Sequence, residues 1–227
     1  MIVAEQKSLE EIKNLVGHAE KVLVLGCGTC VTVCFAGGSR EAAIVAAELR
    51  MTSKLDGAPK DVTDATVQRQ CEWEYLDEVA DQVGQVDVVL SLGCGVGVQA
   101  IAEHFPNSWV VPGLNTKFFG LPTEQGVWEE RCAGCGECIL GLTGGVCPIA
   151  RCSKSLLNGP CGGSLDGHCE INDDVPCGWQ LIYDRLNSQG RLEVLMDIQS
   201  PKSWRTARDG GPRKIVRDDL RLENQDH

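Results

Sequence analysis

The cysteines are the residues of this chain best suited to chemistry, and eight of the thirteen lie in one glycine-rich segment with few apolar residues. These eight are Cys132, Cys135, Cys138, Cys147, Cys152, Cys161, Cys169 and Cys177. The first three follow a C-x2-C-x2-C pattern, which brings three thiolates within reach of one inorganic centre, and Cys147 directly precedes Pro148, as in cluster-binding ferredoxins. Metal–sulfur ligation is therefore the chemistry that this segment predicts.

The nature of the metal stays open at this point. Eight thiols are enough for two four-iron clusters, or for one cluster and one zinc ion held by four thiolates. Zinc alone is a further alternative, but the tight cysteine triple favours iron, because a zinc ribbon normally spaces its ligands as two separated pairs. The segment has too few apolar residues to offset the entropy of ordering a glycine-rich chain, so we expect metal binding to supply its folding energy.

A second group of cysteines is expected at the ends of two strands. The predicted strands 21–25 and 86–92 both run into Gly-Cys-Gly, and the carboxyl ends of parallel strands are where open α/β sheets hold ligands. Cys27 and Cys94 are therefore expected at equivalent, adjacent positions. The predicted four-iron site consists of Cys27, Cys30, Cys34 and Cys94, with Cys71 as the alternate fourth ligand.

Two other uses of these N-terminal residues have to be weighed. Buried cysteine is a common small core residue, so a thiol at one strand end need not bind metal. The Gly26-Cys27-Gly28 turn also begins like the dinucleotide-binding G-x-G-x-x-G pattern, but Val31 stands where the third glycine is needed. No Ser/His/Asp or paired-carboxylate arrangement stands out from the rest of the chain, so no catalytic residue is predicted.

The elements that would carry these cysteines alternate between strand and helix. Apolar runs predict strands at 21–25, 86–92 and 109–112, and helical spacing predicts helices at 9–16 (capped by Ser8), 41–51 (capped by Ser39), 71–83, 97–105 and 177–192. This alternation predicts parallel βαβ units. We therefore expect an α/β fold, with an N-terminal parallel-sheet domain of Rossmann or flavodoxin-like type followed by a small irregular cysteine-rich metal-binding domain. The predicted parts are 1–121, 122–199 and a charged tail, solvated or used for docking, at 200–227.

Composition excludes several classes of function. The formal net charge of −11 argues against nucleic acid as a partner, because a phosphate backbone needs a basic surface. No run of about 18 apolar residues predicts a membrane span, and the N-terminus lacks the basic start and apolar core of a signal peptide. We therefore expect a cytoplasmic protein, in which cysteine clusters bind metal rather than form disulfides.

Several segments carry a resemblance to one family. They are GCGTCVTVCFAGG (26–38), LGCGVGVQ (92–99), NTKFFG (115–120), WEERCAGCGECILGLTGGVCPIARCSKSLLNGPCGG (128–163) and PCGWQLIYDRL (176–186). From about residue 1 to about residue 205, the chain resembles the methylenetetrahydrofolate reductase C-terminal-domain family, in the form of the small iron–sulfur (MetV-type) subunit of acetogen-type reductases.

The resemblance implies a role that the residues alone do not reveal. It implies a flavin-containing catalytic partner of the MetF type, which reduces methylenetetrahydrofolate to methyltetrahydrofolate in the one-carbon metabolism of the reductive acetyl-CoA (Wood–Ljungdahl) pathway. This chain would be a non-catalytic oxidoreductase subunit that relays electrons to that flavin through about two to three [4Fe-4S] clusters, and it would bind neither flavin nor folate itself. The electron donor stays open among ferredoxin, an NADH-oxidising subunit and a bifurcating complex. A zinc-stabilised structural adaptor with no electron-transfer role is the alternative.

Overall fold

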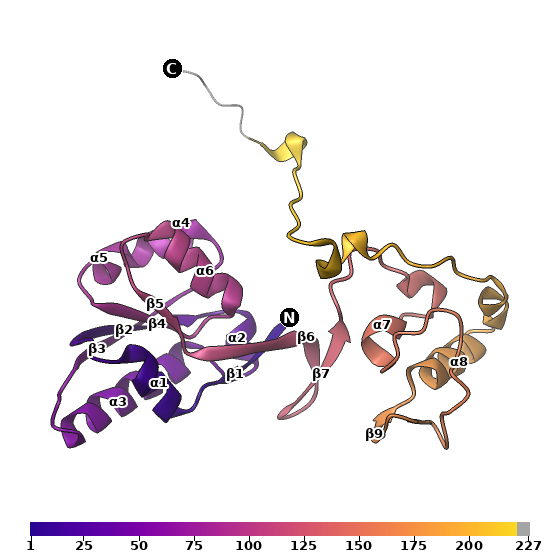
Figure 1. Cartoon of the computed structure of the whole chain (residues 1–227), viewed down its shortest axis with the longest axis horizontal. Helices are drawn as coiled ribbons and strands as arrows, with labels where there is room; N and C mark the ends of the chain where they lie inside the picture. The colour runs from indigo at the N-terminus through magenta and orange to yellow at the C-terminus, as the bar shows by residue number, and fades with distance from the viewer. Residues whose placement is uncertain (222–227) are drawn as a thin grey trace. The chain divides into compact units, whose positions relative to one another are not determined.

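The computed structural model describes residues 1–221 and divides into two compact units, Met1–Glu130 and Arg131–His227 (Figure 1). The first contains a parallel α/β sheet and the second has little regular structure, so the predicted fold class is confirmed. The boundary falls after Glu130 rather than after Leu121, because the strand that contains Leu121 pairs within the first unit. Residues 222–227 of the predicted tail lie outside the described residues.

The first unit is built on four parallel strands in the order β3-β2-β4-β5. The central strands β2 (Lys21–Cys27) and β4 (Val88–Ser91) confirm the two predicted apolar strands, and β5 (Val110–Pro112) confirms the short third one. The edge strand β3 (Asp61–Val67) has no counterpart in the sequence prediction. Its residues are mostly exposed, so it lacks the continuous apolar run that marks a strand buried on both faces.

Helices cover both faces of this sheet (Figure 1). Successive residues of β2 face opposite sides, because Val22 and Val24 pack in one hydrophobic cluster and Leu23 and Leu25 pack in another. The first cluster includes residues of α1 (Leu9–Val16) and α3 (Ser39–Leu55), and the second includes residues of α4 (Trp73–Leu76), the 3-10 turn Asp77–Val79, α5 (Ala80–Val83) and α6 (Gly95–His104). The short helix α2 (Cys30–Val33) follows β2 in the chain.

Helix boundaries depend on local capping. As predicted, α1 begins after Ser8, whose hydroxyl oxygen accepts a hydrogen bond from the Glu11 amide at 3.2 Å. The predicted cap of α3 is wrong: Gly38 is the N-cap, its amide donates to the Glu41 carboxylate at 3.0 Å, and Ser39 is the first helical residue. The helix predicted over 71–83 is observed from Trp73 to Val83, where a 3-10 turn at Asp77–Val79 separates α4 from α5.

A second sheet of the first unit has no counterpart in the sequence prediction. It contains β1 (Ile2–Gln6), β6 (Leu114–Glu124) and β7 (Val127–Cys132), in the order β1-β6-β7. β1 and β6 are antiparallel, and β6 and β7 approach so closely that a Cβ atom on Gly120 would lie 2.2 Å from the Glu129 carbonyl oxygen. β7 ends at the first cysteine of the C-terminal group, so this sheet anchors the start of the cysteine-rich segment.

The second unit is irregular, as predicted. Its main helix, α8 (Gly178–Ser188), confirms the last predicted helix, and Trp179, Ile182 and Leu186 form a small hydrophobic cluster with Cys177. The other elements are η2 (Leu140–Leu142), α7 (Pro148–Arg151), β8 (His168–Cys169), β9 (Asn172–Pro176), η3 (Leu192–Met196), η4 (Trp204–Thr206), η5 (Arg208–Gly210) and η6 (Asp218–Leu220). Across residues 1–221, no helix has the length and apolar character needed to cross a membrane.

Candidate metal centres

The first candidate site lies at the carboxyl edge of the parallel sheet. Cys27 is the last residue of β2, and Cys94 stands at the N-cap of α6, shortly after β4. The two strands pair directly, and the Leu92 amide extends the pairing by donating to the Leu25 carbonyl at 2.8 Å. The two Gly-Cys-Gly turns therefore lie at one edge of the sheet, as the repeated pattern predicts.

A buried glutamine ties this edge together. The Gln70 side chain is fully buried, its Nε2 donates to the Leu25 carbonyl at 2.7 Å, and its Oε1 accepts from the Ser91 hydroxyl at 2.6 Å. The Ser91 oxygen accepts in turn from the Gly93 amide at 3.1 Å. A Cβ atom on Gly93 would lie 2.1 Å from Gln70 Oε1, so a side chain has no room there. Gln70 therefore fixes the ends of β2 and β4 and places the next residue, Cys71, at the same edge.

Cys71 directly follows the buried Gln70 at this edge of the sheet. The Cys71 side chain is exposed overall, but partial burial raises the pKa of its thiol, and the charges of the Cys27 and Cys94 thiolates raise this pKa further. The Cys71 thiol therefore interacts electrostatically with the cysteines that end β2 and begin α6.

The remaining two N-terminal cysteines have different surroundings. Cys30 is the first residue of α2 and is partly exposed. Cys34 follows the same helix and is only 7% exposed. Its thiol lies 3.6 Å from the carbonyl oxygens of both Ala4 and Val31, within the hydrophobic cluster on the α1 and α3 side of the sheet. Cys34 and Cys27 are thus similarly buried, since Cys27 is 8% exposed and belongs to the same cluster, whereas the alternate, Cys71, is exposed.

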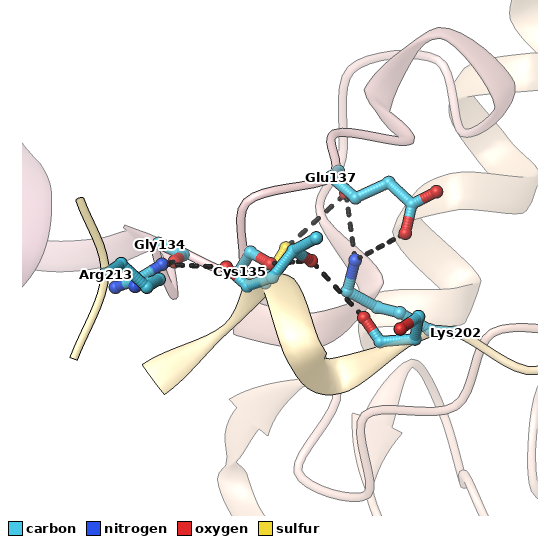
Figure 2. A network of polar contacts seen from close by, with 7 residues as sticks. Gly134, Cys135, Glu137, Lys202 and Arg213 are labelled. Atoms are coloured by element: carbon cyan, nitrogen blue, oxygen red, sulfur yellow. Dashed lines mark hydrogen bonds and ion pairs between the residues drawn. The ribbon is translucent and has the colours of Figure 1, made fainter. Parts of the chain in front are cut away.

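Residues 202–213, called the strap below, bind the loop that carries the C-x2-C-x2-C pattern (Figure 2). The Lys202 ammonium lies 3.1 Å from the Glu137 carboxylate, and the lysine side chain is 4% exposed. The Arg213 guanidinium donates to the Gly134 carbonyl at 2.7 Å. Over this stretch the predicted charged tail is bound to its own unit, although most of its residues are exposed.

The strap approaches the loop so closely that glycine is needed. The Thr206 hydroxyl donates to the Cys135 carbonyl at 2.9 Å. Gly136 has φ of 83°, and a Cβ atom there would lie 2.3 Å from the Thr206 carbonyl oxygen, so both backbone conformation and space exclude a side chain. Within the loop, the Gly134 amide lies 3.4 Å from the Cys132 sulfur as a hydrogen-bond donor. The strap and the glycines thus set the conformation of this cysteine loop.

Of the other C-terminal cysteines, Cys147 caps a short helix and the remaining four line one small cavity. Cys147 is the N-cap of α7, directly before Pro148. A hydrogen bond with the Ser153 hydroxyl at 3.3 Å lowers the pKa of the Cys169 thiol, and the Ile171 backbone amide lowers this pKa further. One small cavity is lined by four of the predicted ligands: Cys152, Cys161, Cys169 and Cys177.

All thirteen cysteines lie within the described residues, and all are free thiols. In the part of the chain that the structure describes, no three or more His, Cys, Asp or Glu side chains stand close enough together to hold a metal ion. The ligand sets predicted from the sequence therefore stay predictions. What the structure adds is the grouping of the thiols into a sheet edge, a loop and a cavity.

Comparison with known proteins finds a family match for one segment of the chain. Residues 111–205 match the family described as "Methylene-tetrahydrofolate reductase C terminal". This segment is similar to the methylenetetrahydrofolate reductase C-terminal family. No curated protein and no solved structure matches the chain. The family segment runs from β5 to the first part of the strap and contains all eight C-terminal cysteines, which confirms the resemblance over this part. The N-terminal cysteines lie outside the reductase-family segment.

Sequence reasoning missed two parts of these sites. Gln70 belongs to no motif, and only its position directly before Cys71 could have drawn attention to it. The strap begins inside the reductase-family segment, but its basic residues resemble those of any charged tail. Gly136 is the clearer clue, because a glycine between two cysteines of a tight loop indicates close approach of another backbone.

Proposed function

We propose that this chain is the iron–sulfur electron-transfer (MetV-type) subunit of a methylenetetrahydrofolate reductase complex. The observation that carries the proposal is the family segment, which contains all eight cysteines from Cys132 to Cys177. In the proposed complex, a separate MetF-type catalytic subunit holds the flavin and binds the folate. This chain passes electrons to that flavin for the reduction of methylene- to methyltetrahydrofolate.

The chemistry of the loop thiols fits a four-iron cluster. Cys132, Cys135 and Cys138 share one loop, and Cys147, which directly precedes Pro148, is the proposed fourth ligand. The Gly134 amide donates to the Cys132 sulfur, and hydrogen bonds of this kind to ligand sulfurs tune the potential of a cluster. A four-iron cluster supplies one-electron transfer when bound. The chain's contribution is to hold the thiolates, with the strap fixing the loop from outside.

At the sheet edge we propose a revised ligand set of Cys27, Cys30, Cys71 and Cys94. Charges of Cys27 and Cys94 raise the pKa of the Cys71 thiol, whereas the Cys34 thiol contacts backbone carbonyls in the core. Cys94 is the N-cap of α6 and therefore lies at the same edge of the sheet as the end of β2. Gln70 acts as a positioning residue, because it holds the strand ends on which the edge is built.

The proposed partners follow from the role of a relay. Cys71 and two cysteines of the loop, Cys132 and Cys138, are exposed, so electrons could enter and leave close to the surface. The net charge of −11 favours partners with complementary basic surfaces. The upstream donor is a low-potential carrier of the ferredoxin class, an NADH-oxidising subunit or a bifurcating complex, and the residues of this chain do not select among them.

Metal analysis tests whether the chain carries clusters at all. After anaerobic purification of the full chain, we expect about eight irons and a similar amount of sulfide, since each of two clusters contains four irons. We expect no flavin in the isolated chain. Fewer than about four irons together with stoichiometric zinc would overturn the relay and favour the structural adaptor.

Electron relay is tested with the catalytic partner present. Donor-driven folate reduction should fall in a Cys30→Ser variant, whereas activity with a dye that reduces the flavin directly should survive, because the catalytic chemistry belongs to the flavin subunit. Cys34→Ser is the matched control and should keep both activities. An unchanged ratio of the two activities in Cys30→Ser would show that the sheet edge is not on the electron path.

A further inference from the structure

A cavity of about 440 Å³ opens beside α8 in the second unit and is called the α8 cavity below. Its walls come from the region of η2, the loop 157–160, α8 and the segment 194–199, and apolar atoms make up most of its surface. The volume lies within the range of about 300–1,000 Å³ that is usual for binding pockets. The described residues that line it include none of the eight C-terminal cysteines, so the candidate metal centres do not account for it.

Hydrogen bonds within the walls fix the shape of the α8 cavity. The Asn158 side chain binds the backbone of Gln199 twice, because its Nδ2 donates to the Gln199 carbonyl at 2.9 Å and its Oδ1 accepts from the Gln199 amide at 2.7 Å. This pair holds the segment after η3 against the loop 157–160. Trp179 is buried, and its indole N–H donates to the Leu156 carbonyl at 3.0 Å. The cavity is therefore formed before a partner binds, which lowers the entropic cost of filling it.

The lining of the α8 cavity is acidic. Of the described residues that line it, none is Lys, Arg or His, and Asp197 is the only acidic residue. Asp197 is exposed, and its carboxylate forms no ion pair with another residue of the described part, 1–221. Tyr183, which is 47% exposed, lines the same cavity. An unpaired carboxylate and an exposed aromatic ring beside apolar walls favour a cation with an apolar stem, and they disfavour phosphate and carboxylate groups.

The position of the cavity in the sequence indicates which partner supplies this cation. Every lining residue, from Ile139 to Gln199, lies within the segment 111–205 that matches the reductase family. Under the proposed function, the reductase chemistry lies on a separate catalytic subunit. A binding surface within the reductase-family segment is then expected to contact that subunit rather than the upstream electron donor.

We propose that the α8 cavity receives an arginine side chain that projects from the flavin-containing catalytic subunit, and that this contact anchors the two subunits to each other. The aliphatic stem packs on the apolar walls, while the planar guanidinium pairs with Asp197 and stacks on the Tyr183 ring, which a lysine ammonium does less well. Arginine is enriched among the residues that contribute most to the affinity of protein interfaces. The inference rests on the proposed function, because that function supplies the partner.

The affinity of the purified catalytic subunit for the full-length chain tests the anchor. Asp197→Asn should weaken binding about tenfold or more, because the guanidinium then stays charged in the interface without its carboxylate. Glu193→Gln is the matched control, since it removes the same charge from η3 at a residue that does not line the cavity. The control should change the affinity less than about twofold.

The outcomes separate this inference from the proposed function. No binding by the wild-type chain would overturn the proposed function and the anchor together. Binding that Asp197→Asn leaves unchanged, or that both variants weaken equally, would overturn the anchor alone. Hydrogen–deuterium exchange of the wild-type complex gives a test without any variant: amides of residues 194–199 should exchange more slowly than in the free chain, and unchanged exchange there would also overturn the anchor.

A double-mutant cycle then identifies the arginine. Among Arg→Ala variants of the catalytic subunit, one should weaken binding to the wild-type chain about tenfold but binding to Asp197→Asn less than about twofold, because the second substitution removes a contact that the first has already broken. The proposal is wrong if no arginine of the catalytic subunit couples to Asp197 in this way.

Discussion

Replacing Gln70 with alanine tests whether one buried side chain holds the ends of β2 and β4 together. The change removes the hydrogen bonds to the Leu25 carbonyl at 2.7 Å and from the Ser91 hydroxyl at 2.6 Å. The Leu25 oxygen keeps the Leu92 amide as a donor, but the buried Ser91 hydroxyl loses its acceptor. The two bonds together contribute about 1–2 kcal/mol and the unpaired hydroxyl costs about 1–2 kcal/mol, so we expect the first unit to lose about 2–4 kcal/mol.

Hydrogen–deuterium exchange of the full chain measures this loss in each region. Amides of β2 and β4 should exchange about 30- to 700-fold faster, since 1.4 kcal/mol corresponds to a factor of ten, while peptides of the second unit should not change. Gln99→Ala is the matched control, because that exposed side chain donates only to the Gly95 carbonyl of its own helix, and we expect an effect within about 0.5 kcal/mol. Equal effects of the two substitutions on exchange in β2 and β4 would refute the role of Gln70 in holding the two strand ends together.

Two further predictions concern the candidate sites. Cys71→Ser should abolish the electron paramagnetic resonance spectrum of the proposed sheet-edge centre, whereas Cys34→Ser should preserve it. The reason is that the Cys34 thiol contacts backbone carbonyls in the core, whereas the Cys71 thiol interacts with Cys27 and Cys94. The opposite result would restore the ligand set predicted from the sequence. Gly136→Ala should release the strap and speed its cleavage by trypsin, because the new Cβ atom would lie 2.3 Å from a backbone oxygen. Gly145→Ala is the control, since Gly145 has a similar φ of 89° but open space around it, and equal cleavage rates would show that close approach is unimportant.

The parts of the fold that the sequence predicts are those with a strong periodic pattern. Strands β2 and β4 are buried on both faces, so their residues form the continuous apolar runs from which they were predicted. The exposed edge strand β3 and the terminal strand β1 have no such run, and pairing with a partner strand determines their conformation. Residues 71–83 have helical composition, yet α4 and α5 are one turn each, because tertiary packing outweighs local propensity here.

At the sheet edge, the sequence locates the site but does not select its members. The repeated Gly-Cys-Gly pattern places Cys27 and Cys94 at equivalent strand ends, because parallel strands bring equivalent positions together. Spacing also groups Cys34 with Cys27, but α2 turns the Cys34 thiol toward the Ala4 carbonyl in the core. Cys71 follows a strand that the pattern does not reveal, so its place at the edge depends on the burial of Gln70.

In the second unit, the sequence identifies all eight thiols but cannot divide them into sets. The loop set follows a local pattern, because a C-x2-C-x2-C spacing brings sulfurs together within one turn of chain. The cavity set depends on contacts made by residues that are not cysteines. Gly178 allows α8 to reach the end of α7, Ser153 contacts Cys169, and Gly163 leaves room for Glu170. A larger side chain at Gly178 or Gly163 would push two cysteine-bearing segments apart without altering any thiol. The grouping of these thiols around one cavity therefore depends on the small residues beside them.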